Sequence, residues 1–158
     1  MAAVLVAYDT KNGSTAEVAA AIAKRLESHE IAVRIAPARD VRDLSGVDAV
    51  VVGAPIYNGR WLSGAHRLVK RLTRIAPPSR PVLAVFALGP RVDDSPQDWE
   101  RPRAQFEHAL GKHPDAAPVA TALFGGADPP RKTPRRDIRD WDAIASWADE
   151  LAARLGES

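Results

Sequence analysis

Apolar residues gather in three short runs along the chain, at residues 4–8, 49–54 and 82–88. Runs of this length that are apolar throughout are typical of strands buried on both faces of a parallel sheet. Residues 31–36 alternate between apolar and polar positions instead, which predicts an edge strand with one wetter face, and residues 119–124 predict the last strand. The pattern therefore predicts five strands.

Between these strands, apolar residues recur at the spacing of a helix. The spacing predicts helices over residues 16–26, 61–74, 102–111 and 140–155, and a brief helical turn over residues 41–44. Trp61 falls on the apolar stripe of the second helix, so it is expected in the core. Pro102 is expected as the first residue of the third helix, and Trp141 on the apolar face of the last one.

Strands that alternate with helices predict an α/β protein, a doubly wound three-layer sandwich whose right-handed crossovers place helices on both faces of the sheet. The 158 residues contain no internal repeat and no long linker, so a single domain over residues 1–158 is expected. In such folds ligands bind beyond the C-terminal ends of the strands. Three loops are expected there, over residues 9–15, 54–61 and 88–99.

The loop after the first strand has the composition of an anion site. Residues 10–15 read Thr-Lys-Asn-Gly-Ser-Thr and lead into a helix, whose first N–H groups lack partners and favour a bound phosphate. The hydroxyls of Thr10, Ser14 and Thr15 would add donors. An alternative needs no ligand, because Ser14 can be the N-cap of the helix and Glu17 its capping-box partner. The loop alone leaves both interpretations open.

Composition excludes several kinds of site. Hydrophobic residues make up 46% of the chain and charged residues 27%, as in a globular protein. The absence of cysteine excludes disulfides and thiolate chemistry, and the histidines show no spacing typical of metal ligands, so no metal site is expected. No apolar run approaches the ~20 residues of a membrane span, and the residues after Met1 resemble a strand rather than a signal peptide. A cytoplasmic location is therefore expected.

Positive charges gather in two segments, although the net charge is only +2. One segment covers residues 60–80 and the other residues 131–139. Such clusters suit an acidic partner, an anionic membrane surface or nucleic acid, but a solvated basic face is the commoner explanation of either cluster alone. No nucleic-acid partner is expected, because the cations are not interleaved with exposed aromatic residues and match no nucleic-acid module.

Taken together, the loops resemble those of one family. Residues 10–15 after the first strand resemble the phosphate loop of flavodoxins. Residues 53–60, Gly-Ala-Pro-Ile-Tyr-Asn-Gly-Arg, resemble the second loop of flavodoxin-like domains, most closely in the subgroup that contains the menaquinone-dependent protoporphyrinogen oxidases. Residues 88–90, 124–127 and 140–141 also resemble that subgroup. The similarity runs the whole length of the chain.

This resemblance implies a flavodoxin-like sandwich with a five-stranded parallel sheet of order 2-1-3-4-5 and a bound FMN. The residues that it implies around the phosphate are Thr10, Lys11, Asn12, Gly13, Ser14 and Thr15. Those that it implies around the isoalloxazine ring are Pro55, Ile56, Tyr57, Asn58 and Gly59 on one side and Leu88, Gly89 and Pro90 on the other. A flat ring needs aromatic or aliphatic walls, which Tyr57 can supply. Trp99 either covers the ring or anchors the next helix.

The function that the resemblance implies is an FMN-binding oxidoreductase that moves electrons between a reduced donor and a quinone- or porphyrin-like acceptor, with no side chain needed as acid or base. The alternatives are a single-electron carrier that docks on redox partner proteins and a scaffold that has lost its cofactor. Carrier flavodoxins are commonly acidic and bear an aromatic residue in the third loop, whereas residues 89–92 are Gly-Pro-Arg-Val. The basic segments would attract an acidic substrate or an anionic membrane surface.

Overall fold

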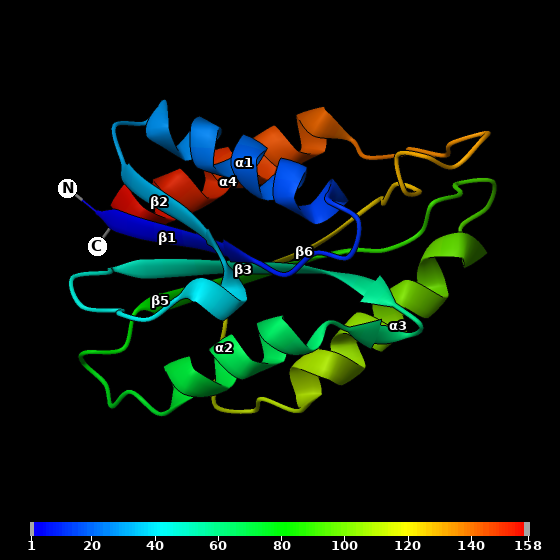
Figure 1. Cartoon of the computed structure of the whole chain (residues 1–158). Coiled ribbons are helices and arrows are strands. Elements are labelled where there is room, and N and C mark those ends of the chain that lie inside the picture. Colours follow the sequence, from blue (N-terminus) through cyan, green and yellow to red (C-terminus); the bar gives the residue numbers. More distant parts are fainter. Residues whose placement is uncertain (1, 157–158) are drawn as a thin grey trace.

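A parallel sheet forms the middle layer of the protein, and helices cover both of its faces (Figure 1). The computed structural model describes residues 2–156. The strands are β1 (Ala3–Tyr8), β2 (Ala32–Pro37), β3 (Ala49–Tyr57), β4 (Arg60–Trp61), β5 (Val82–Leu88) and β6 (Ala120–Phe124). The helices are α1 (Ser14–Glu27), α2 (Ser63–Thr73), α3 (Gln97–Gly111) and α4 (Trp141–Gly156), with a 3₁₀ turn η1 (Ala38–Asp40). Within this part of the chain, no helix has both the length and the apolar character that a membrane span requires.

The strands of the parallel sheet follow the order β2-β1-β3-β5-β6, and the short β4 pairs antiparallel with the end of β3. Without β4 this is the order 2-1-3-4-5, so the prediction of a flavodoxin-like α/β sandwich is confirmed. β2 lies at the edge beside β1, as its alternating pattern predicts. α1 and α4 cover one face of the sheet, and α2 and α3 cover the other (Figure 1).

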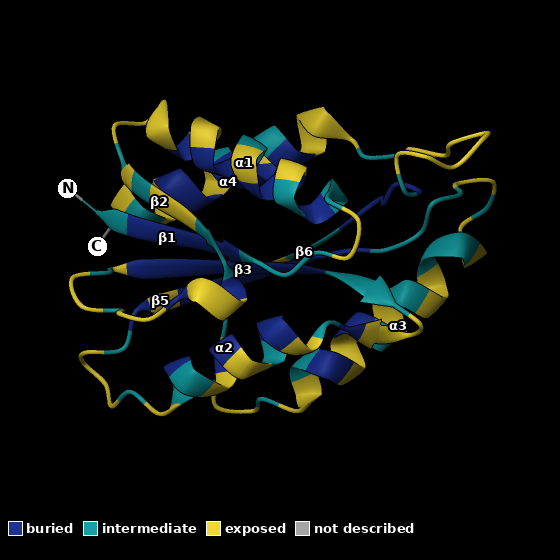
Figure 2. Cartoon of the chain, viewed as in Figure 1, coloured by how far each residue is buried: buried dark blue, intermediate teal, exposed yellow. Residues whose placement is uncertain are grey.

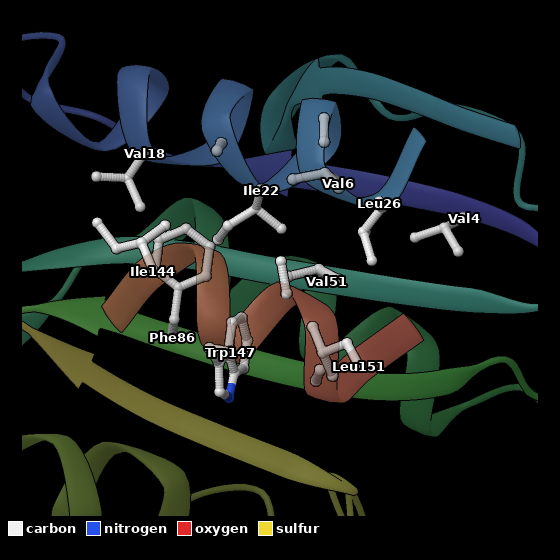
Figure 3. Close-up of a cluster of buried hydrophobic side chains, with 14 of the residues drawn as sticks. Val4, Val6, Val18, Ile22, Leu26, Val51, Phe86, Ile144, Trp147 and Leu151 are labelled. Atoms are coloured by element: carbon white, nitrogen blue, oxygen red, sulfur yellow. The ribbon is translucent and has the colours of Figure 1, made fainter. Parts of the chain in front are cut away.

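Two apolar cores lie on opposite faces of the sheet. One packs the sheet against α1 and α4 and includes Val6, Ile22, Phe86 and Trp147 (Figure 3). The other packs the opposite face against α2 and α3. Figure 2 shows the central strands in dark blue between helices whose outer surfaces are largely yellow. This burial on both faces explains why the central strands are apolar throughout.

The densest packing in the first core depends on a glycine. Phe86 contacts Phe124 and Trp147, and the ring centroids lie 6.0 Å apart in each pair. Gly53 is the partner of Phe86 across the ladder between β3 and β5. The Phe86 ring covers Gly53 so closely that a Cβ at position 53 would overlap the ring atoms. A side chain at this position would therefore compete with Phe86 for the same space.

Several element boundaries differ from the predicted ones. The helical turn lies at η1 rather than at residues 41–44. α2 begins at Ser63, so Trp61 belongs to β4, although it is buried in the core as expected. Pro102 lies inside α3 rather than at its start. Trp141 is 44% exposed and lies outside the core, and the guanidinium of Arg139 lies 4.9 Å from its ring.

The early start of α3 has a local electrostatic cause. Asp98 and Glu100 stand in the first turn, where the helix dipole favours negative charge. Asp98 Oδ2 also accepts hydrogen bonds from the backbone N–H groups of Asp94 and Ser95 at 2.9 and 3.0 Å, which fold the preceding loop onto the helix. Trp99 Nε1 donates to Asp93 Oδ1 at 3.0 Å, so this indole anchors the start of the helix.

Candidate functional site

Three loops meet at one edge of the sheet, beyond the C-terminal ends of β1, β3 and β5 (Figure 1). The parallel pairing of β1 with β3 and of β3 with β5 places these strand ends side by side. From β1 the chain passes to β2 on one side and later to β3 on the other, so the switch point of the sheet lies between β1 and β3. Crevices at such a point are where open α/β sheets bind their ligands.

The loop after β1 ends in a turn that requires glycine. Gly13 has a φ of 94°, in the left-handed region, and donates its N–H to Thr10 Oγ1 at 2.9 Å. Gly13 is the N-cap of α1, so Ser14 is the first helical residue, and no side chain caps the helix. The capping-box interpretation is therefore wrong. Glu17 accepts instead from Arg139 Nη1 at 3.1 Å.

The side chain of Thr15 is buried, and its hydroxyl lacks a hydrogen-bond partner among the described residues. The residue is 0% exposed. A buried polar group without a partner destabilises a protein by about 1–3 kcal/mol. The N–H groups of Ser14, Thr15 and Ala16, in the first turn of α1, have no acceptor within the helix either. A ligand with several acceptor oxygens would satisfy the hydroxyl and these amides together.

Two further contacts tie this loop to its neighbours. Asp9 Oδ2 accepts the backbone N–H of Gly64 at 2.8 Å, at the start of α2, where the positive end of the helix favours a carboxylate. Lys11 Nζ lies 5.0 Å from the centroid of the Tyr57 ring, which is a cation–π distance. Asn12, the residue after Lys11, is exposed. The loop is therefore fixed between α2 and the end of β3.

The second predicted loop is a β-hairpin. β3 continues through residues 55–57, Pro-Ile-Tyr, which are half-buried, and the chain reverses into β4 at Asn58 and Gly59. Both turn residues have positive φ angles, of 51° and 76°, as a two-residue type I′ turn requires. The prediction of an irregular loop over residues 54–61 is wrong, because the Asn-Gly pair selects a tight turn that extends the ladder.

The third loop is packed closely against its surroundings. Leu88 is buried at the end of β5, and the N–H of Gly89 donates to the carbonyl of Phe124 at 2.8 Å. A Cβ at Gly89 would lie 2.9 Å from Leu123 Cδ1 and 3.1 Å from Pro102 Cβ. Glycine is therefore needed at position 89 for the packing of α3 and β6, and its amide is already engaged within the sheet.

A cleft of about 320 Å³ lies between the hairpin and the third loop. The residues that line it are Ile56, Tyr57, Asn58, Gly89, Arg91, Val92 and Arg136. The cleft thus combines two of the three predicted loops, and it adds Arg91, Val92 and Arg136, which sequence reasoning did not select as site residues. The phosphate-loop residues 10–15 do not line the cleft, but Lys11 reaches its wall through the ring of Tyr57.

A buried carboxylate organises the segment between β6 and α4. Asp128 is 1% exposed and accepts hydrogen bonds from the backbone N–H, Nε and Nη2 of Arg136 at 3.0, 2.8 and 3.1 Å. Arg91 Nη1 and Lys132 Nζ lie 3.5 and 3.6 Å from the same carboxylate. The hydrogen bonds from Arg136 hold the pKa of Asp128 well below its usual range, and the charge of Lys132 adds to this effect. One side chain therefore holds three cations beside the cleft.

The same segment contacts the other two parts of the site. The N–H of Gly126 donates to the carbonyl of Pro90 at 2.7 Å, which joins the segment to the third loop. Arg139, whose side chain is 4% exposed, donates from Nη1 to the carbonyl of Ser14 at 3.3 Å. These contacts join residues far apart in the sequence, so no local pattern predicts them. The one related feature in the sequence is the concentration of arginines in this segment. Within residues 2–156, no group of three or more potential metal ligands gathers.

We expect Asp128→Asn to lower the thermal unfolding midpoint, Tm, at pH 7, because the variant leaves Arg136, Arg91 and Lys132 without the charge that they share. The pKa of Asp128 is depressed in the folded protein, so its stabilising effect is complete above the unfolded carboxyl pKa of ~3.9 and declines as the pH falls below it. The Tm difference should therefore stay constant from pH 7 to about pH 4 and narrow as the pH falls further. Asp40→Asn, an exposed control, should not change Tm, and a Tm difference that persists undiminished at pH 3 would contradict this account.

The topology and the edge site define a class of α/β proteins that bind a ligand at the switch point of the sheet. A family model for the flavodoxin domain matches residues 5–130. The chain therefore belongs to the flavodoxin domain family, and the expectation drawn from its loops is confirmed at that level. No curated protein matches the chain.

Solved structures of flavodoxins share the fold across their whole length. A short-chain flavodoxin associated with a PDU bacterial microcompartment superposes with a TM-score of 0.69 at 17% identity, covering 98% of this chain and 99% of that one. The flavodoxin of Streptococcus pneumoniae TIGR4 gives 0.64 at 16% identity, with coverage of 98% and 99%. The rubredoxin oxygen:oxidoreductase of Desulfovibrio gigas gives 0.62 at 18% identity, covering 98% of this chain but 36% of that one.

Flavodoxin domains bind FMN, and the residues of this chain fit its phosphate. The fit rests on the buried Thr15 hydroxyl without a partner and on the open N–H groups at the start of α1. Gly13 allows the turn that presents these donors on one side. The cleft beside Tyr57 offers an aromatic wall at the same edge of the sheet.

Proposed function

We propose that the protein uses FMN to transfer electrons between a reduced donor and a quinone- or porphyrin-like acceptor. The observation that carries this proposal is the buried, unpartnered hydroxyl of Thr15 beside the open amides of α1. A phosphate group is the ligand that suits such a set of donors, because each of its oxygens accepts hydrogen bonds. Residues 10–14 complete the proposed phosphate loop, with Thr10 fixing the turn at Gly13.

The proposed ring site is the cleft between the hairpin and the third loop. Of the proposed ring residues 55–59 and 88–90, those that line the cleft are Ile56, Tyr57, Asn58 and Gly89. When bound, FMN supplies the electron-transfer chemistry. The chain holds and orients the ring, with Tyr57 as an aromatic wall and Lys11 against that wall. No side chain is assigned a role as acid or base.

The charge of the cleft favours a substrate that carries acidic groups. Arg91 and Arg136 line it, and their side chains are 34% and 46% exposed. With Lys132 they place three positive charges around the single carboxylate of Asp128. The surplus charge attracts anions. A porphyrin-like substrate, whose carboxylates are negatively charged, suits this cleft and fits the resemblance of the loops to the menaquinone-dependent protoporphyrinogen oxidases. An anionic membrane surface would be attracted by the same charges.

A single-electron carrier is the second candidate, favoured by the end-to-end likeness to solved flavodoxins. Such a protein would dock on redox partner proteins through its charged faces. The rate of its reduction by a reductase would therefore fall steeply as the salt concentration rises. The third alternative is a scaffold without a cofactor. It leaves the hydroxyl of Thr15 and the nearby N–H groups of α1 without an acceptor among the described residues.

The function is tested by mixing the purified protein with FMN and recording its absorbance and its FMN affinity. Yellow protein with a defined stoichiometry supports the proposal, and failure to bind FMN at high concentration removes it. Turnover of protoporphyrinogen with menaquinone would then identify an enzyme. Bound FMN without such turnover, but with fast salt-sensitive reduction by a reductase, would identify a carrier instead.

We expect Arg91→Gln to lower the reduction potential of the bound FMN by a few tens of millivolts, where about 59 mV corresponds to a tenfold change in a one-electron equilibrium. The reason is that Arg91 lines the cleft, and a nearby cation stabilises added negative charge. A potentiometric titration followed by absorbance measures the effect. Arg103→Gln, an exposed position on α3, is the matched control. An unchanged potential in the Arg91 variant would contradict the placement of the ring in this cleft.

A further inference from the structure

A second depression, of about 450 Å³, lies on the face covered by α2 and α3 and shares no residue with the FMN cleft. It lies between the outer surface of α2 and the segment that follows α3. Its charged and titratable lining residues are His66, Arg67 and Lys70 from α2, and Lys112, His113 and Asp115 from that segment. The proposed function assigns no role to this depression.

The cations of the depression lack counter-charges. Arg67, Lys70 and Lys112 form no ion pair with a carboxylate in residues 2–156, and Asp115 is the one acidic residue in the lining. Three like charges gathered in a hollow repel one another. The hollow therefore carries a net positive charge that a bound anion would offset.

Other cations of the same basic segment behave differently. Arg71 donates to the carbonyls of Val41 and Arg42 at 2.7 and 3.0 Å. Arg80 donates to the carbonyls of Ile75, Thr73 and Asp115 at 2.8, 2.8 and 3.1 Å. These two arginines fasten loops to the end of α2. The fold thus engages some cations of this segment as structural donors and leaves those of the depression without a carboxylate partner among residues 2–156. Within this range Arg67 donates from Nη2 only to Ser63 Oγ, at a long 3.5 Å.

A pair of histidines forms part of the wall. His66 Nδ1 and His113 Nε2 lie 2.7 Å apart, so one of these nitrogens carries a proton and donates a hydrogen bond, and the other is unprotonated and accepts it. His66 is held edge-on against Trp61, with ring centroids 5.4 Å apart. Burial lowers the pKa of both histidines, and the charge of Lys112 lowers each further. A bound anion would offset these cations and favour one added proton on the pair, which the hydrogen bond between the two rings allows.

We propose that this depression is a proton-linked binding site for a small phosphate-bearing anion. The three cations of the depression supply the charge, and the histidine pair supplies N–H donors whose number rises when the anion binds. Binding takes up protons, so the affinity increases as the pH falls from about 8 to about 6. The site shares no residue with the proposed FMN site.

The test is a titration of the full chain with sulfate, followed residue by residue by NMR in the presence of saturating FMN. Sulfate stands in for the phosphate dianion because its charge does not change between about pH 6 and pH 8, so a pH dependence reports the protein. We expect saturable shift changes centred on residues 66–73 and 112–115, and an affinity at least tenfold tighter at the lower pH. Shift changes at Thr15 would report sulfate in the phosphate loop separately.

Variants make the assignment specific. Combined Lys70→Gln and Lys112→Gln should weaken sulfate binding at least tenfold, whereas Lys24→Gln with Arg154→Gln, two exposed positions elsewhere, should not change it. His113→Gln should remove the pH dependence and leave the weaker binding of the higher pH. Inorganic phosphate should compete with sulfate and acetate should not. Shift changes that do not saturate, that spread over every basic surface, or that persist unchanged in the double lysine variant would overturn the proposal.

Discussion

Thr15→Val should lower the affinity for FMN by roughly 10- to 150-fold and leave the FMN-free protein as stable as before, or more stable. Valine has nearly the shape of threonine, so the packing at the start of α1 is kept. The substitution removes a hydroxyl that is buried without a partner in the free chain, which relieves a destabilising feature. It also removes one donor to the phosphate, and hydrogen bonds to charged groups contribute about 1.5–3 kcal/mol each.

Affinity is measured by fluorescence or calorimetric titration with FMN, and stability by chemical unfolding without it. Thr121→Val is the matched control, because Thr121 is an exposed strand residue on which valine is well tolerated. It should change neither quantity. Equal loss of stability and affinity in the Thr15 variant would mean that the hydroxyl has a structural role. Unchanged affinity would mean that the phosphate lies elsewhere.

Gly53→Ala should destabilise the protein by about 3 kcal/mol or more. The added methyl group would overlap the ring of Phe86, and that ring cannot retreat because Phe124 and Trp147 pack against it. Phe86 is 0% exposed, so no solvent-facing rotamer offers relief. The measurement is urea unfolding followed by circular dichroism, which gives the free energy of unfolding directly.

A second substitution distinguishes this steric cause from a general loss of backbone freedom. Phe86→Leu by itself replaces the ring by a smaller side chain and should lower the free energy of unfolding. The double variant should be more stable than the sum of the two single losses predicts, because the added methyl group would occupy space that the ring leaves. Gly111→Ala is the control for replacing glycine, since a Cβ at position 111 would meet nothing within 4 Å and the φ there is not left-handed. It should be neutral. Additive losses in the double variant would contradict the proposed overlap.

The strands of the sheet could be predicted because a strand buried on both faces is apolar at nearly every position. The apolar runs at residues 49–54 and 82–88 became β3 and β5, and the alternating run at residues 31–36 became the edge strand β2. Strand order and the meeting of the loops followed from the resemblance and from the rule for parallel crossovers. These features depend on patterns several residues long, which chance variation seldom produces.

The parts that failed depend on single residues or on distant contacts. Ser-x-x-Glu suggested a cap, yet Gly13 takes the N-cap position, because its positive φ allows Thr10 to close the turn. The start of α3 was missed because Pro102 looked like a first residue and the preceding turn is polar. The Asp128 cluster joins Arg91 of the third loop to the segment between β6 and α4, and no local pattern reveals a contact between segments so far apart in the sequence. The FMN-contacting residues remain predictions that the titrations above will test.

The segment between β6 and α4 has a further consequence for engineering. Its base is fastened on both sides, by the pairing of Asp128 with Arg136 and by the bridge between Ala127 and Asp137, whereas residues 131–134 at its tip are exposed. Extra residues at an exposed tip add little closure entropy, since that cost grows only with the logarithm of loop length. Insertions there would reshape the rim of the cleft, which Arg136 of this segment lines, while the proposed FMN loops keep their sequence. This tip is therefore the natural place to graft new selectivity onto the scaffold.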